Sequence, residues 1–224
     1  MRPLKLLSVL AVLFTSGPSF GQDWIKYVDR TERFIVNFPV EPDVRNITYL
    51  SERGATLPAR VYTAEDRSNS YSVTVVDYTD AERLLLERYE RAGEPLSSSR
   101  FISDVLGSIA YAAWNIRQGG GEITYDAWAA IDRIAGHQLQ VTNADESRTF
   151  VGIYLHASRL YILEATVPPG WPPPGHFQQS LGILDDEGRR VRYSLDVDGN
   201  RTRVETSYEW IGSDEPETGG QSTR

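Results

Sequence analysis

Apolar and polar residues alternate along most of the chain after residue 24, and this period of two predicts β-strands. Phe34, Val36 and Phe38, for example, would point to one side of a strand, with Ile35 and Asn37 between them. Residues 71–78 (YSVTVVDY) are the richest in the β-branched and aromatic residues that favour strands. Strands are predicted over residues 34–38, 44–49, 57–64, 71–78, 122–131, 137–143, 149–156 and 159–167.

Three segments have apolar residues at helical spacing instead. The first helix is predicted from an N-cap at Asp80 to Tyr89, and the second over residues 101–117, where the glycines at 119–121 would stop it. A short third helix is predicted over residues 175–184. The apolar side chains that would face the core are Leu84, Leu85 and Tyr89 in the first helix, Phe101, Val105, Ile109, Ala112 and Ile116 in the second, and Phe177, Leu181 and Leu184 in the third.

Turn residues join neighbouring strands into hairpins. Gly54 provides a turn after the second strand, and Ala157-Ser158 is short enough for a tight hairpin. Asp198-Gly199 would close a last hairpin of residues 191–197 and 201–210. Strands, then two helices, then more strands, a helix and a hairpin are typical of an α+β fold with an antiparallel sheet.

The first 22 residues have the three parts of a secretory signal peptide. These parts are a basic start (Arg2, Lys5), an apolar run (residues 6–14), and small residues at the −3 and −1 positions of a cut before Gln22 (Ser19, Gly21). We therefore predict a signal peptide over residues 1–21, cleaved before Gln22 or nearby. The expected location is periplasmic or secreted.

A retained membrane anchor is the alternative for this segment. A spanning helix needs about 20 apolar residues, whereas this run is under half that length and is followed by Gly17-Pro18. There is no cysteine at the cut to carry a lipid, so no membrane insertion is expected after cleavage. The remainder is predicted to be one domain over residues 22–212. Residues 213–224 have no large apolar side chain and are predicted to be a disordered tail.

Charge and cysteine content disfavour several functions. With 23 Lys and Arg against 31 Asp and Glu, the formal net charge is −8, and loss of Arg2 and Lys5 with the leader takes it to −10. Neutralisation of phosphates dominates nucleic-acid binding, and anionic membrane surfaces attract basic segments, so neither is an expected partner. The absence of cysteine excludes thiol catalysis and thiolate metal sites.

Three stretches carry a family resemblance. They are residues 33–42 (RFIVNFPVEP), residues 71–78, and residues 159–166 (RLYILEAT) followed by a proline-rich loop and residues 177–181 (FQQSL). Over about residues 24–184 the chain resembles the PsbP-like and DcrB-like superfamily of exported proteins. The resemblance implies an α/β/α sandwich, in which a central, mostly antiparallel sheet has helices on both faces. It also implies a non-enzymatic accessory or binding role, with no catalytic motif to carry over.

No catalytic or metal-binding motif stands out. His137, His156 and His176 have no metal-ligand spacing, and there is no Gly-x-Ser-x-Gly sequence. Ser108, next to Gly107, is expected on the surface of the second helix. We therefore predict no set of catalytic residues, no metal site and no cofactor.

Two carboxylates keep an enzymatic alternative open. By strand alternation, Asp77 lies on the same side as Tyr71, Val73 and Val75, and Glu164 lies on the same side as Leu160, Ile162 and Thr166. A carboxylate on a buried face has a raised pKa unless it is paired, and two such acids could serve a hydrolase, with or without a metal. The structural alternative is an ion pair, with Arg60 or Arg133 as the partner.

Trp171 and His176 are the predicted binding residues. Trp171 lies between Gly170 and Pro172 in a stiff loop, and His176 begins the third helix. Tryptophan is enriched where proteins contact partners, although a tryptophan that covers the sheet is the structural alternative. The sequence predicts an exported, non-enzymatic binding or accessory protein of the bacterial envelope, whose partner is an unknown envelope protein or a small molecule. The alternatives are the carboxylate hydrolase and a domain that senses a small ligand in a pocket between sheet and helix.

Overall fold

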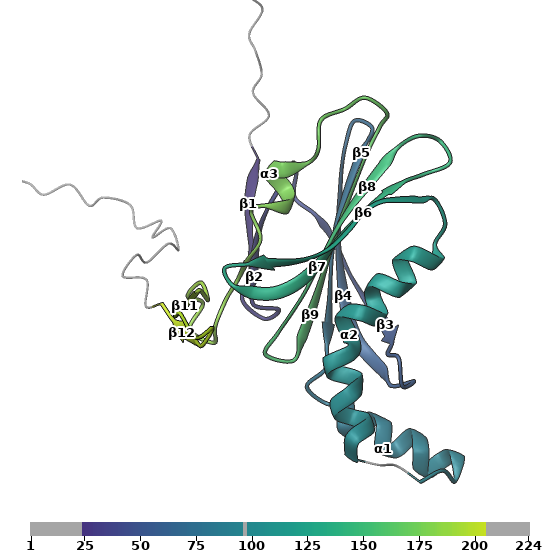
Figure 1. Ribbon diagram of the computed structural model, residues 1–224. Helices are drawn as coiled ribbons and strands as arrows, with labels where there is room; N and C mark the ends of the chain where they lie inside the picture. Colours follow the sequence, from purple (N-terminus) through teal and green to yellow (C-terminus); the bar gives the residue numbers. More distant parts are fainter. Residues whose placement is uncertain (1–23, 96–97, 205–224) are drawn as a thin grey trace, which may run out of the picture.

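The structure, a computed structural model, describes residues 24–95 and 98–204 (Figure 1). The predicted signal peptide and tail lie outside these residues, as does the end of the predicted last hairpin. None of the described helices is both long and apolar enough to cross a membrane.

Seven of the alternating segments form one antiparallel sheet, here the main sheet. Its strand order is β3 (Asp43–Leu50), β4 (Thr56–Asp66), β5 (Asn69–Asp77), β9 (Arg159–Val167), β8 (Arg148–His156), β7 (Ile134–Thr142) and β6 (Glu122–Ile131). Consecutive strands pair as hairpins, and the central pair β5–β9 joins the two runs of hairpins. The predicted α+β class with an antiparallel sheet is confirmed.

The predicted turns are present, and they fix the register of the strands. The backbone N–H of Gly54 donates to the Ser51 carbonyl at 3.0 Å, with Gly54 at a φ of 88°. Ala157 and Ser158 have φ values of 45° and 59°, a left-handed pair that is typical of a two-residue hairpin turn.

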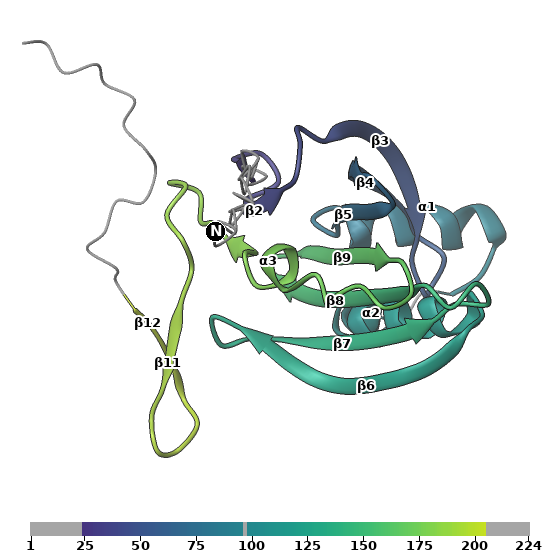
Figure 2. The same ribbon diagram turned by 90° about the horizontal axis from the view of Figure 1, so that it is seen from above.

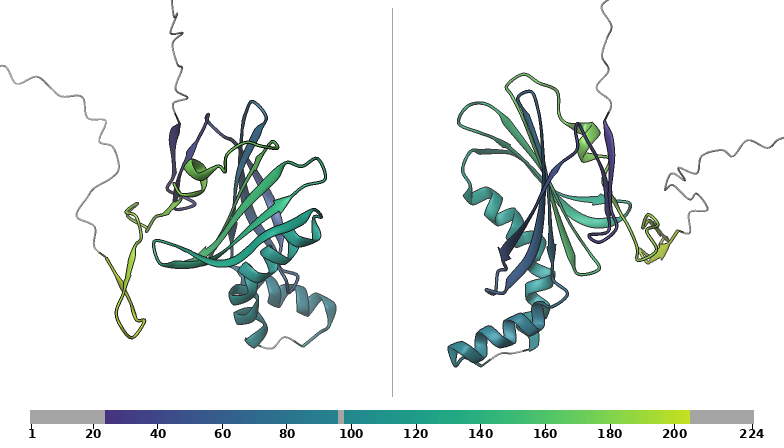
Figure 3. Two further views of the ribbon diagram at one scale, coloured as in Figure 1. Left: turned by 45° about the horizontal axis from the view of Figure 1, so that its top comes forward. Right: turned by 180° about the vertical axis from the view of Figure 1, so that it is seen from behind.

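The helix face of the main sheet is crossed by α2 (Ser98–Gln118), and α1 (Ala81–Ala92) lies next to α2 at one end of this face, as Figures 1 and 3 show. Leu85 and Tyr89 of α1 and Ala112 and Ala113 of α2 belong to one buried core, together with apolar side chains of the sheet. Both predicted helices are confirmed. Asp80 lies at the N-terminal cap position of α1, but its carboxylate makes no cap hydrogen bond and instead pairs with Arg83 at 3.0 Å.

The opposite face, here the small-sheet face, is covered by a three-stranded sheet and one turn of helix. These elements are β1 (Ile25–Asp29), β2 (Phe34–Phe38), α3 (Gly175–Gln178) and β10 (Gly182–Ile183). Aromatic side chains fill the interface: the rings of Phe34 and Tyr62 are 4.9 Å apart, and those of Phe38 and Phe177 are 5.4 Å apart. The expected sandwich with helical layers on both faces is therefore not confirmed.

The predicted third helix is too long. It ends at Gln178, and Gly182–Ile183 pairs with β2 as a strand. Ser180 stabilises the change of structure, because its hydroxyl accepts a hydrogen bond from the Asn37 backbone N–H and donates one to the Phe177 carbonyl, both at 2.8 Å. Long-range pairing with β2 thus overrides the helical spacing of the apolar residues.

A last hairpin of β11 (Tyr193–Leu195) and β12 (Arg201–Arg203) extends away from the main sheet (Figure 2). The Asp196 carboxylate accepts hydrogen bonds from the backbone N–H groups of Asp198 and Asn200 within its turn. The segment before it is fastened to the β6–β7 turn, because Asp132 accepts a hydrogen bond from Arg190 at 2.6 Å.

Removal of an aromatic ring from the small-sheet face tests whether that layer contributes to folding. Phe34 is fully buried, and we expect Phe34→Ala to lower the free energy of unfolding by about 3–5 kcal/mol in urea denaturation. Val197→Ala, at a fully exposed position, should change it by less than about 0.5 kcal/mol. A cost for Phe34→Ala no larger than that of the control would contradict the packing described.

Candidate functional site

The two carboxylates predicted from the sequence lie on opposite faces of the main sheet. Asp77 belongs by alternation to the small-sheet face, and Glu164 to the helix face. In the β5–β9 register Glu164 is opposite Ser72 and Asp77 is opposite Arg159, so five residues, about 17 Å of strand, separate them. The structure does not bring the two acids together.

Each acid has its own local setting. Asp77 accepts a hydrogen bond from the backbone N–H of Thr79 at 2.8 Å. Glu164 is largely buried, and burial raises the pKa of its carboxyl group. The suggested partner Arg60 lies 3.7 Å from Asp29 and 3.5 Å from Glu32 instead.

Trp171 and His176 have different partners. The Trp171 side chain is partly exposed, and its carbonyl accepts a hydrogen bond from Arg148. The His176 ring packs edge-on against Trp24, with 4.8 Å between ring centroids, and its Nε2 lies 3.3 Å from the Asn37 side-chain nitrogen. His176 thereby connects α3 to the small sheet.

A buried polar cluster lies between α2 and the β3 side of the main sheet, where no site was predicted. Asp104 and Ser108 are fully buried, and Tyr78 is 1% exposed. The Oδ1 of Asp104 accepts a hydrogen bond from the Arg53 backbone N–H at 2.9 Å. Its Oδ2 and the hydroxyls of Ser108, Tyr78 and Tyr49 make none with the residues that the structure describes. Tyr49, Tyr78, Asp104 and Ser108 are termed the polar chamber.

Helical spacing explains how α2 contributes to the chamber. Asp104, Ser108 and Tyr111 follow one another at intervals of four and three residues, so they share one side of the helix. The expectation that Ser108 lies on the helix surface is wrong. The Tyr49 ring from β3 meets the Tyr111 ring edge-on, with 6.4 Å between centroids.

A short loop between β3 and β4 brings the remaining groups to α2. Two hydrogen bonds hold the ends of this loop together. The Ser51 backbone N–H donates to the Ala55 carbonyl at 2.9 Å, and the Ala55 backbone N–H donates to the Ser51 hydroxyl. Glu52 leans over Gly107, where a Cβ would lie 2.9 Å from the glutamate Oε2. The absence of a side chain at Gly107 therefore lets Glu52 lie against α2.

The chamber is negative and poorly solvated. Burial raises the pKa of Tyr49 to about 12, with smaller contributions from Tyr111 and Asp104. Burial also raises the pKa of Tyr78, and the nearby Tyr49, Asp104, Tyr111 and Glu52 add to this effect. Phenolic hydroxyls in this environment stay protonated at physiological pH.

An open groove of about 390 Å³ adjoins the chamber on the surface of α2. It is lined by Glu52, Ala110, Tyr111 and Trp114. The Tyr111 and Trp114 rings are stacked, 6.0 Å apart. Tyr111 and Glu52 therefore belong to the groove and also lie near the Tyr78 hydroxyl.

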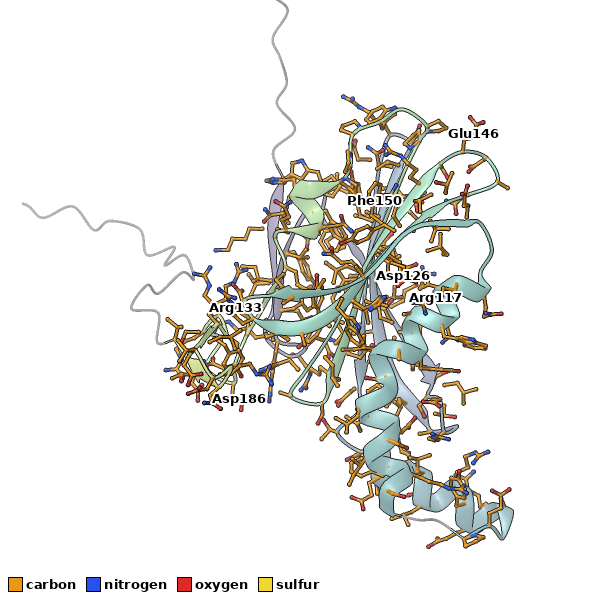
Figure 4. All side chains as sticks on the ribbon, in the orientation of Figure 1. Arg117, Asp126, Arg133, Glu146, Phe150 and Asp186 are labelled. Carbon is orange, nitrogen blue, oxygen red and sulfur yellow. The ribbon has the colours of Figure 1, made fainter. Side chains whose placement is uncertain are left out.

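A second polar cluster joins the end of α2 to β6 and β7 (Figure 4). Asp126 accepts hydrogen bonds from Arg117 at 2.8 and 2.9 Å and lies 2.5 Å from His137 Nε2. Partial burial opposes ionisation, but these hydrogen bonds hold the pKa of Asp126 below its usual value. All three side chains are paired, so the cluster fastens the helix to the sheet. Within residues 24–95 and 98–204, no group of three or more histidines and acids could hold a metal ion.

The sequence matches no protein-family model and no curated protein. The fold has a weak likeness to a solved structure. That structure is the solution structure of cyanobacterial PsbP (CyanoP) from Synechocystis sp. PCC 6803, with 12% sequence identity and a TM-score of 0.44. The likeness covers 77% of this chain and 99% of the cyanobacterial one.

One sequence signal could have revealed the chamber. An acid and a serine four residues apart, Asp104 and Ser108, interrupt the part of α2 that would otherwise be apolar on its inner side. The burial of that side depends on the angle at which the helix crosses the sheet, which spacing alone does not specify.

Glu164 provides a test of the electrostatics at the sheet. Its folded pKa is raised, so its charged form destabilises the fold as the pH rises above about 4.5. We expect Glu164→Gln to raise the free energy of unfolding at pH 8 by about 1 kcal/mol and to change it little at pH 4. Urea denaturation at both pH values measures this, with the exposed Glu122→Gln as a control that shows no such difference. Equal stability of Glu164→Gln and wild type at pH 8 would rule the effect out.

Proposed function

We propose that this protein is an exported binding protein of the bacterial envelope that contacts another protein through the outer side of α2. Export rests on the predicted signal peptide. The sequence motifs that resemble those of PsbP-like and DcrB-like proteins support a non-enzymatic binding role of this kind.

A row of exposed apolar side chains along α2 carries the proposal. Ile102, Leu106, Ala110 and Trp114, here the α2 ridge, recur at intervals of four residues and so form one line on the helix. Leu106 is 72% exposed, Ile102 54% and Trp114 51%. Contiguous exposed apolar surface is typical of a protein contact, because solvent exposure of such side chains is unfavourable without one.

The edge of the main sheet next to α2 extends this surface. β3 is an edge strand with nearly all of its side chains exposed, including Val44, Ile47 and Leu50. Ile47 lies two residues from Tyr49 and therefore on the same face, the one that α2 covers. An unpaired strand edge can also add a strand from a partner.

The hydrolase alternative has less support. It requires two carboxylates at one substrate, and Asp77 and Glu164 face opposite sides of the main sheet. The exposed apolar side chains of α2 and β3 favour a binding surface and provide no group for bond cleavage.

Site-specific photo-crosslinking in the intact cell tests the contact. We expect a photoreactive phenylalanine analogue at Leu106 or Trp114 to give the same discrete adduct. The same analogue at Val197, a fully exposed residue of the last hairpin, should give none, because that hairpin extends away from the main sheet and from α2 (Figure 2). Equal labelling from all three positions would count against the α2 ridge as the contact.

A charge on the ridge gives the matching loss-of-binding test. Leu106→Glu should abolish the adduct formed from position 114 while it changes the free energy of unfolding by less than about 0.5 kcal/mol, because the side chain is exposed. An adduct that survives Leu106→Glu would contradict the proposal.

A further inference from the structure

Besides the Tyr49 hydroxyl, three buried oxygens in the polar chamber have no hydrogen bond within the described part of the chain. They are Asp104 Oδ2, Ser108 Oγ and the Tyr78 hydroxyl. Each unsatisfied buried group costs free energy, and native proteins contain few of them. Three at one place, all able to accept hydrogen bonds, point to a ligand that donates.

The three acceptors match the donors of a primary ammonium group. Such a group has three N–H donors and no acceptor. The nearby charges also favour a cation. Asp104 has a backbone N–H as its hydrogen-bond partner, and Glu52 lies at the groove beside it. Of the basic side chains nearby, Arg53 pairs with Glu52 at 3.5 Å, so a cation at Glu52 competes with this guanidinium, whereas the Arg88 guanidinium lies over the Tyr89 ring.

Aromatic rings provide the remaining surface that an alkylammonium ion needs. Tyr49, Tyr111 and Trp114 follow one another from the chamber to the groove, with centroid separations of 6.4 and 6.0 Å. Faces of tyrosine and tryptophan attract cations and also pack against methylene groups. A hydrated inorganic ion would make less use of this surface.

We propose that the polar chamber binds the primary ammonium group of a small aliphatic amine, whose chain lies in the groove between Tyr111 and Glu52. Asp104 neutralises the ammonium group, and Ser108 and Tyr78 accept its other hydrogen bonds. Glu52, at the groove, is placed to pair with a second ammonium group, so a diamine makes the fullest use of the site. Access requires a displacement of the exposed Glu52 side chain.

Thermal denaturation with 1,4-diaminobutane as the probe tests the site. At about 10 mM we expect the melting temperature to rise by about 3 °C or more. Three compounds separate the contributions: 1,4-butanediol lacks the charge, tetramethylammonium lacks N–H donors, and potassium chloride supplies an inorganic cation. All three should give less than a third of that shift. An equal shift with any of them, or no shift with the diamine, would overturn the proposal.

Substitutions then assign the binding to the chamber. Asp104→Asn keeps the oxygen that accepts from Arg53 and should weaken diamine binding at least tenfold in titration calorimetry, since it removes a charge-assisted hydrogen bond. Ser108→Ala and Tyr78→Phe should weaken it about three- to tenfold. Glu122→Gln, which removes an exposed acid, should leave it unchanged.

The ligand-free variants provide a second readout. Ser108→Ala and Tyr78→Phe each remove a hydroxyl without a hydrogen bond, so the free proteins should melt at or above the wild-type temperature. Leu106→Glu should bind the diamine like wild type, because Leu106 belongs neither to the chamber nor to the lining of the groove. Wild-type affinity in Asp104→Asn, or loss of binding only in variants that melt early, would overturn the assignment.

Discussion

The pairing of β5 with β9 is the interaction on which the rest of the molecule depends. These two strands are apolar on both faces: Val73 and Leu163 lie in the core beneath the small sheet, and Val76 and Ile162 lie in the core beneath the helices. The strands are more than 80 residues apart in the sequence, so their pairing closes a long loop at an entropic cost. Burial on both faces offsets this cost, and without the pair neither covering layer would have a surface to pack on.

Burial on both faces also explains the position of the two acids. In a sheet with one buried face, apolar residues lie on that face, and two carboxylates on the same side as apolar residues would therefore share it. Here Asp77 and Glu164 each have apolar neighbours and still point in opposite directions. Alternation in a single strand identifies residues on the same side of that strand, but it does not say which layer covers that side.

Elements with strong local signals could be predicted, and those held by distant contacts could not. The long strands, α1, α2 and the glycine and hairpin turns follow from period, propensity and turn chemistry. β1 and β10 are short, and Gly182–Ile183 is a strand only because it pairs with Phe34 and Ile35, almost 150 residues earlier. The polar chamber was missed for the same reason, since Asp104 accepts a hydrogen bond from Arg53 and lies near Tyr49 and Tyr78, all of which are distant from it in the sequence.

Over part of its length α2 departs from the pattern of an ordinary surface helix. Such a helix turns apolar residues inward and polar residues outward. From residue 102 to residue 114, α2 buries Asp104 and Ser108 and exposes Ile102, Leu106 and Trp114. Both departures cost folding free energy, one through unsatisfied polar groups and the other through solvated apolar surface. Sequences that break a local rule twice in the same three turns generally do so at functional positions, where a ligand or partner makes the contacts that the free protein lacks.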